Sequence, residues 1–286
     1  MAIPKMTVRR VQFNLKENLN KHYVAGNIFA THYLNSLHII FPEGEKFFIR
    51  SVKKFQHKIE DAQLKKDIKD FIGQEGVHFN EHHKFWSVLA EQGLDPLTFA
   101  DFYVKTGYDG LEKLLYKALG EENGAKLSLS VTAALEHYTA MFGEWALTGI
   151  HGDMSMPKEM KMLMHWHAAE EIEHKAVTFD VLMAVDNSYA RRIAGMIIAS
   201  WGLFFYSMLG TIYFVAKDKD KNWWTLSSEF FGFITKMGGD YQRGNLIGNF
   251  LAYFKKDFHP NTIDNHHLAE EFFAKNKGFY QEVTMS

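Results

Sequence analysis

Two sets of carboxylate and imidazole side chains have the spacing of single helix faces. The first set is spaced i, i+3 and i+7 and the second i, i+4 and i+7: Glu75, His78 and His82, then His167, Glu171 and His174. Residues at these spacings form one stripe along an α-helix. Imidazole and carboxylate groups are ligands for zinc, iron and manganese. The two stripes therefore predict metal-ion chemistry.

A single glutamate precedes each stripe by roughly 30 to 35 residues, the length of a helix hairpin. These glutamates are Glu45 and Glu136, and the latter lies inside an apolar run. One Glu from each of two helices, plus Glu-x-x-His from each of two others, is the ligand set of a dinuclear centre in a four-helix bundle. Its carboxylates offset the repulsion between two divalent cations ~3.5–4 Å apart.

Other ionisable residues near the stripes have several interpretations. His82 and His83 can each be a ligand, a partner of a ligand or an exposed side chain. Glu170 and Glu173 flank the second stripe, and either can orient a ligand imidazole. Two histidines fall off the stripes and are expected to be structural: His137 and His165.

The segment HAAEEIEH also suits a solvated helix face. Its neighbours at helical spacing are apolar, however: Met164, Ala168, Ile172 and Val177. This places part of the face inside the protein. Because buried ionised glutamates are costly unless they are paired or bound to metal, the metal interpretation is favoured.

Composition excludes several other classes of site. The chain has 286 residues, 15 histidines, no cysteine and a formal net charge of -2. Without cysteine there are no disulfides, thiolate zinc sites, iron–sulfur clusters or cysteine nucleophiles. A charge near zero gives no field for a polyanion, so no nucleic-acid partner is expected.

The elements that must position these residues are predicted to be helices. We expect a single all-α domain, a ferritin-like four-helix bundle with a dinuclear metal site and additional C-terminal helices. Its parts are an extended arm (1–25), the metal-binding bundle (42–190), and an apolar helix with C-terminal helices (191–286). The first helix is predicted to begin at Pro42, and a later one to have Pro157 in its first turn with Ser155 as cap. Helices are predicted over 42–60, 64–92, 125–147 and 157–185, with a broken stretch over 97–120.

One segment is long and apolar enough to cross a bilayer. Residues 193–216 carry no formal charge, and a helix of this length spans about 36 Å. Charged residues flank it on both sides, whereas Trp201 lies in its middle rather than at an interface. A membrane anchor, an in-plane membrane helix, a core helix and the wall of a lipid tunnel all remain open.

Two segments resemble a known bacterial family, the predicted metal-dependent hydrolases: FPEGEKFFIRSV (41–52) and WHAAEEIEHKAVTFDV (166–181). The order of ligands is also similar to that of the di-iron p-aminobenzoate N-oxygenases, in which an additional histidine is a seventh protein ligand. This second resemblance implies the metal ligands Glu45, Glu75, His78, Glu136, His167, Glu171 and His174.

These observations favour a dinuclear non-haem iron oxygenase of the N-oxygenase or hydroxylase type. Its cofactors would be two iron ions, and Glu75, Glu136 and Glu171 its catalytic carboxylates. The first alternative is a hydrolase that uses a hydroxide bridging zinc or manganese ions. The second is a non-catalytic or iron-storage bundle. A hydrolase should have a charged clamp or oxyanion donor, and only Arg50 and Lys175 lie near the motifs.

The expected partners follow from the same features. The substrate is expected to be a small, hydrophobic molecule, with O2 and an electron donor if the protein is an oxygenase. The N-terminus has no apolar core of signal-peptide length, which predicts a cytoplasmic protein. Residues 193–216 would associate it with a membrane surface, and a homodimer is the other means of covering them.

Overall fold

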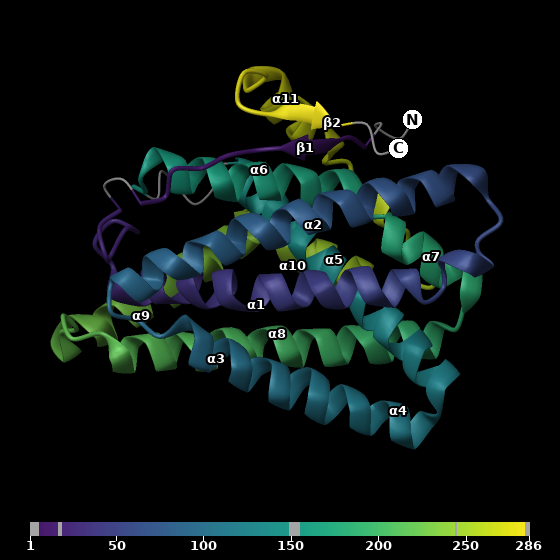
Figure 1. Ribbon diagram of the computed structural model, residues 1–286, viewed down its shortest axis with the longest axis horizontal. Helices are drawn as coiled ribbons and strands as arrows, with labels where there is room; N and C mark the ends of the chain where they lie inside the picture. The colour runs from purple at the N-terminus through teal and green to yellow at the C-terminus, as the bar shows by residue number, and fades with distance from the viewer. Residues whose placement is uncertain (1–5, 17–18, 149–154, 244, 284–286) are drawn as a thin grey trace.

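Long helices make up most of the chain in the computed structural model, which describes residues 6–16, 19–148, 155–243 and 245–283 (Figure 1). The all-α class is therefore confirmed. The helices are α1 (Ile28–Lys53), η1 (Gln56–Lys58), α2 (Ala62–Glu91), α3 (Pro96–Tyr103), η2 (Val104–Glu112), α4 (Lys113–Leu119), α5 (Glu121–Thr148), α6 (Lys158–His174), α7 (Val177–Val185), α8 (Tyr189–Lys217), α9 (Trp223–Arg243), α10 (Leu246–Ala252), η3 (Pro260–Thr262) and α11 (His266–Lys275).

Four helices surround the centre of the molecule: α1, α2, α5 and α6. Helix α1 packs along α2, and α5 packs along α6, while α8 lies against both α1 and α5. Each pair is close in sequence, so the two hairpins predicted from the spacing of the glutamates are present. One apolar cluster lies towards each end of this bundle.

Helix α1 begins at Ile28, so the prediction that it begins at Pro42 is wrong. Asn27 caps its first turn by accepting a hydrogen bond from the Ala30 backbone N–H. Pro42 lies inside the helix, where it removes the N–H that would donate to the carbonyl of His38. The indole Nε1–H of Trp86 donates to that carbonyl instead, at 2.9 Å. A side chain of α2 thus replaces the backbone bond that proline removes from α1.

The stretch from residue 96 to residue 119 is continuous, not broken at its glycines as predicted. Its middle, η2, is a π-helix that includes Gly107 and Gly110. A π-helix is wider than an α-helix and is frequently found at functional sites. The glycines at which we expected a break therefore lie in the wider turns of a π-helix.

Two other predicted boundaries also differ. The helix expected over 157–185 is interrupted at Lys175 and Ala176, which separate α6 from α7. Pro157 is the N-cap residue of α6 and Ser155 does not cap it; the Ser155 carbonyl accepts a hydrogen bond from the Ala25 backbone N–H at 2.9 Å.

The N-terminal arm contains a strand. Strand β1 (Val8–Arg10) pairs antiparallel with β2 (Gln281–Val283), so that Val8 faces Val283 in the register. Figure 1 shows this small sheet beside α11, on the side of the bundle opposite α8. The pairing brings the two ends of the described chain together over α6.

Candidate metal centre

The predicted residues of both stripes meet in the middle of the bundle. Helix α1 supplies Glu45, α5 supplies Glu136, and the other two helices supply the remaining residues: Glu75, His78 and His82 from α2, and His167, Glu171 and His174 from α6. All eight side chains are buried. The exposed His83 lies outside this group.

The ligand atoms form several overlapping groups, and two of them share Glu75. One comprises Glu45, Glu75 and His78, and the other Glu75, Glu136, Glu171 and His174. Within each group the atoms lie within 4.8 Å of one another. Glu75 belongs to both groups, which is the position of a carboxylate that bridges two metal ions. Glu171 also lies 3.4 Å from His78 Nδ1, so it too reaches both groups.

His174 shows how poorly protons alone fit this arrangement. Its Nε2 lies 3.2 Å from Glu75 Oε1, 3.2 Å from Glu136 Oε2 and 3.1 Å from Glu171 Oε2. One ring N–H donates well to only one acceptor at a time. A divalent cation in place of that proton would attract all three carboxylates together.

Several buried polar atoms of the cluster lack hydrogen-bond partners within the described part of the chain. These are both carboxylate oxygens of Glu45, Glu75 and Glu136, and Nδ1 of His78. A buried polar group without a partner is strongly unfavourable. Because the unpartnered atoms point to one region and come from hard oxygen and imidazole donors, the residues fit divalent metal ions.

The charges of the metal-free cluster lead to the same conclusion. Burial raises the pKa of Glu45 and Glu75 well above the ordinary value, and it raises that of Glu136 to about 7. Burial opposes a charge on His78, but the hydrogen bond to Glu170 and the nearby carboxylates of Glu171 and Glu75 outweigh it and raise its pKa to about 10. The metal-free site therefore holds protons that metal ions would displace.

The ring nitrogens that face the cluster are selected by outer hydrogen bonds. His78 Nε2 donates to Glu170 at 3.0 Å, which leaves Nδ1 towards the carboxylates. His174 Nδ1 donates to Gln74 Oε1 at 3.1 Å, which leaves Nε2 towards them. Such outer partners fix the tautomer and orientation of ligand imidazoles. Glu170 thus has the position expected for an orienting residue.

These outer partners converge on Arg9 of β1. Its guanidinium donates to Glu170 at 3.0 Å and to both oxygens of Glu173 at 2.7 and 2.8 Å. Glu173 also accepts from Gln74 Nε2 at 2.9 Å. The opposite face of Arg9 stacks on Phe273, with Cζ 3.4 Å from the ring centroid. Arg9 therefore connects the supports of both histidines.

Sequence reasoning missed Arg9, Gln74 and His38. Arg9 lies in an arm expected to be irregular, and a glutamine gives no metal-ligand signal. His38 lies seven residues before Glu45, on the same helical stripe. This signal was hidden because the helix was predicted to start after it.

A row of buried histidines leads away from the cluster. His167 Nε2 donates to Glu171 Oε1 at 2.7 Å, and its Nδ1 lies 2.6 Å from His82 Nε2. His82 Nδ1 in turn lies 2.7 Å from His38 Nδ1. His82 therefore contacts a predicted ligand and, with Glu45 and His167, also forms a group that could hold a metal ion.

The other residues considered from the sequence lie elsewhere. His137 is buried and bonds to the carbonyl of Asn249, and burial lowers its pKa to about 4. Arg50 pairs with Glu112, and Lys175 donates to the carbonyl of Ile263 at 2.6 Å. Neither cation lies among the clustered ligands.

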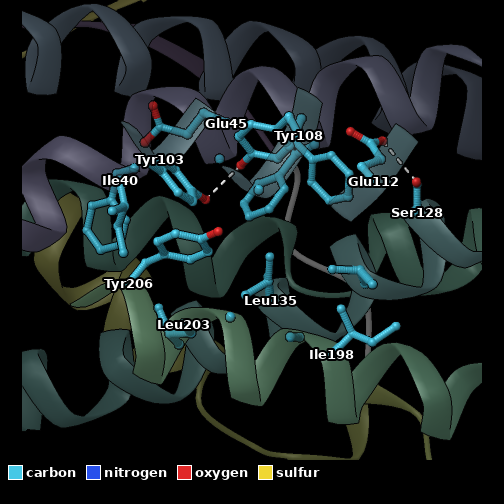
Figure 2. A pocket seen from close by; sticks show the side chains of 18 of the residues that line it. Ile40, Glu45, Tyr103, Tyr108, Glu112, Ser128, Leu135, Ile198, Leu203 and Tyr206 are labelled. Carbon is cyan, nitrogen blue, oxygen red and sulfur yellow. Dashed lines mark hydrogen bonds between the residues drawn. The ribbon is translucent and has the colours of Figure 1, made fainter. Parts of the chain in front are cut away.

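Two apolar cavities meet at Glu171 and His167. The first encloses about 1120 Å³, its mouth included, and lies between α1, the 103–115 region, α5 and α8. Figure 2 shows Glu45 at its wall, with Tyr103, Tyr108 and Tyr206 around it. The second encloses about 920 Å³ between α1, α5, α6 and α9. Among the residues whose side chains the structure describes, no lysine or arginine lines either cavity.

An all-α bundle with a buried glutamate–histidine cluster that fits two metal ions defines a metal-binding helical protein. The family model described as "predicted metal-dependent hydrolase" matches residues 7–264, and the chain belongs to this family. The match covers Arg9 and the whole cluster. No curated protein and no solved structure matches the chain, so the likeness to ferritin-like bundles and to the N-oxygenases stays a prediction.

Proposed function

We propose that this protein is a hydrolase that requires two divalent metal ions and cleaves an ester of an apolar acid or alcohol. The description of its family supports hydrolysis, the first alternative of the sequence analysis, over oxygenation. The observation that carries metal dependence is the group of buried carboxylates without partners at the meeting point of two cavities.

The proposed ligands are Glu45, Glu75, His78, Glu136, His167, Glu171 and His174. When bound, the metal ions supply a water of lowered pKa and polarise the substrate carbonyl. The four glutamates would balance the charge of two divalent ions, so His78 and His174 can bind as neutral imidazoles. Gln74 and Glu170 hold the two rings in the orientation that this requires.

His167 and Glu171 are proposed to act on the substrate because both line the two cavities. Burial and the nearby His78 lower the pKa of His167 to about 4, so this imidazole is neutral and can bind a metal ion through one nitrogen. Its Nδ1 contacts His82 Nε2, which would orient the ring. Glu75 and Glu136 line neither cavity and are proposed to hold the metal ions.

The cavities also define the substrate class. Their lining is mostly apolar, and no lysine or arginine is among the described residues that line them, which disfavours a phosphoester. An uncharged ester with long apolar chains fits this lining.

A di-iron oxygenase is the second candidate because of one observation. A Glu from each of two helices with a Glu-x-x-His from each of two others is the ligand set of the di-iron bundle proteins, and this chain has it in Glu45, Glu136, Glu75-x-x-His78 and Glu171-x-x-His174. The described residues of the cavity linings provide no basic clamp beside it. With iron as the metal, the protein would then require O2 and an electron donor for an apolar substrate.

One set of measurements tests the proposal. Purified protein is analysed for metal content, then assayed with nitrophenyl esters from acetate to laurate, and its Fe(II) form is mixed with O2. Hydrolysis that rises with chain length and is lost on chelation supports the hydrolase. O2 consumption without ester cleavage overturns it in favour of the oxygenase.

Variants test the proposed ligands. Glu171→Ala and His174→Ala are expected to lose metal, whereas His83→Ala, an exposed histidine next to His82, is expected to keep it. Normal metal content in Glu171→Ala would show that the ligand assignment is wrong.

A further inference from the structure

The exposed large apolar side chains are concentrated in one part of the molecule. Among the described residues, all of them lie within 97–119 and 189–251. On α8 they form one helical stripe, here called the apolar face: Ile197, Trp201, Phe204, Phe205 and Ile212. Phe204 is 70% exposed and Ile212 61%. Figure 1 shows α8 beside α3 and α4, on the side away from α11 and the strands.

The opposite side of α8 is fixed against the bundle by small residues. A Cβ at Gly195 would lie 2.1 Å from Ser130 Oγ, and one at Gly210 would lie 2.3 Å from Ser36 Oγ. Ser36 belongs to α1 and Ser130 to α5, and such close packing leaves no room to rotate α8. The apolar face therefore remains directed outward.

This packing also argues against a membrane-spanning α8. It is the described helix that is long and apolar enough to cross a bilayer, and 33% of its most apolar window is buried. Because α8 lies against α1 and α5, inserting it upright would carry their buried glutamates and histidines into hydrocarbon. A helix lying in the plane of the membrane avoids this cost.

The first cavity runs from the apolar face to the candidate metal centre. Ile198, Leu203 and Tyr206 of α8 lie on one side of it, and Tyr108 of η2 lies on the facing side (Figure 2). Trp201 and Gly202 also line it, so the cavity opens beside the exposed stripe. A second copy of the chain on this face would close that opening.

The C-terminal end of the apolar face is basic and aromatic. Lys217 and Lys219 are exposed, and neither forms an ion pair with another described residue. The acidic residues next to these lysines in the sequence pair with another lysine: Lys21 contacts both Asp218 and Asp220. Trp223 and Trp224 begin the next helix, α9, and are 65% and 92% exposed. Exposed lysine and tryptophan at one end of an apolar face suit the level of anionic lipid headgroups.

We propose that the apolar face lies in the surface of an anionic lipid bilayer, with α8 parallel to the membrane plane. Membrane-dissolved substrate then enters between α8 and the 104–119 segment. The bilayer part stands on the exposed stripe and its basic end; the substrate part rests on the proposed function.

Flotation with vesicles tests the bilayer part. The protein is floated with vesicles of phosphatidylcholine alone and of phosphatidylcholine with phosphatidylglycerol. We expect stronger binding to the anionic vesicles. Ile197→Ser with Phe204→Ser should weaken it about tenfold or more, because two exposed apolar side chains that would enter the bilayer are lost. The control carries Glu270→Ser and Lys277→Ser, two exposed residues on the opposite side, and should bind normally.

A second experiment tests the entrance. The side chain of Gly202→Phe would meet no atom within 4 Å at its Cβ and would extend into the opening. This variant should bind vesicles normally but lose uptake of a dansyl-labelled fatty acid. Gly232→Phe, equally free of contacts on α9, is the control that keeps both.

Specific outcomes overturn the inference. Equal flotation of the serine variant and the wild type would exclude the apolar face as the binding surface. A stable dimer in light scattering, disrupted by the serine variant and indifferent to vesicles, would assign the face to a second copy. Normal probe uptake by Gly202→Phe would exclude the entrance. None of these readouts needs turnover or metal, so they stay separate from a failure of the proposed hydrolase.

Discussion

At the scale of single residues, the cluster depends on which nitrogen each histidine presents. His78 and His174 present different ring nitrogens, Nδ1 and Nε2, and each choice is made by a partner behind the ring. Gln74 has a defined amide orientation because its NH2 group donates to Glu173 and to the Thr7 carbonyl. Its oxygen is therefore the atom left for His174.

This arrangement predicts a loss of metal affinity in Gln74→Leu. Leucine preserves the volume but cannot accept from His174 Nδ1, so the ring loses its fixed tautomer. Loss of such an outer partner typically weakens metal binding by about 10–100-fold. Competition with a chelator of known affinity measures the change. Gln63→Leu, at an exposed position of the same helix, should leave the affinity unchanged; an equal loss there would refute the argument.

At the scale of elements, α1 and α2 are joined by more than apolar packing. Pro42 leaves the carbonyl of His38 without its helical donor, and Trp86 of α2 supplies the substitute. His38 also contacts His82 of α2. The turn of α1 that Pro42 disrupts is therefore fixed to α2 next to the row of buried histidines.

A double-mutant cycle tests this substitution of donors. Trp86→Phe leaves a buried carbonyl unpaired and should lower the free energy of unfolding by about 1–3 kcal/mol. In a Pro42→Ala background the backbone N–H of residue 42 can donate to the same carbonyl, so the loss should be smaller. Urea unfolding of the four proteins gives the coupling. Additive effects would show that the indole bond does not replace the missing one.

At the scale of the whole molecule, the metal-free cluster makes stability depend on pH. The pKa of Glu136 is raised to about 7 and that of His78 to about 10. A raised pKa stabilises the folded state below the unfolded value, and this contribution is lost as pH rises through the folded pKa. Glu171 and His167 have lowered pKa values, so their contributions no longer change above about pH 6.5.

We therefore expect the metal-free protein to lose stability between about pH 7 and about 10. Burial lowers the pKa of Lys175 to about 8, which acts in the opposite direction but equally with and without metal. The gap in melting temperature between metal-loaded and metal-free protein should thus widen as pH rises. Calorimetry across this range checks it, and a gap that narrows would contradict the charge states described for the cluster.

The residues of the cluster could be predicted from the sequence more accurately than the elements and contacts around them. The i, i+3, i+4 and i+7 spacings brought Glu75, His78, Glu171 and His174 together because helical periodicity is local. The start of α1 was wrong because proline is usually a helix boundary, and only a contact from α2 makes Pro42 tolerable inside the helix. Arg9 could not be predicted, since its role arises from a strand pairing between distant residues.

That strand pairing has a consequence for the order of folding. Val8 meets Val283 only after almost the whole described chain has been enclosed, and closing so long a loop is slow. The hairpins of the bundle are local and can form earlier. The supports of His78 and His174 that pass through Arg9 are thus completed late. Until then the pocket is assembled but loosely oriented, and its discrimination between metal ions depends on the final closure of the chain.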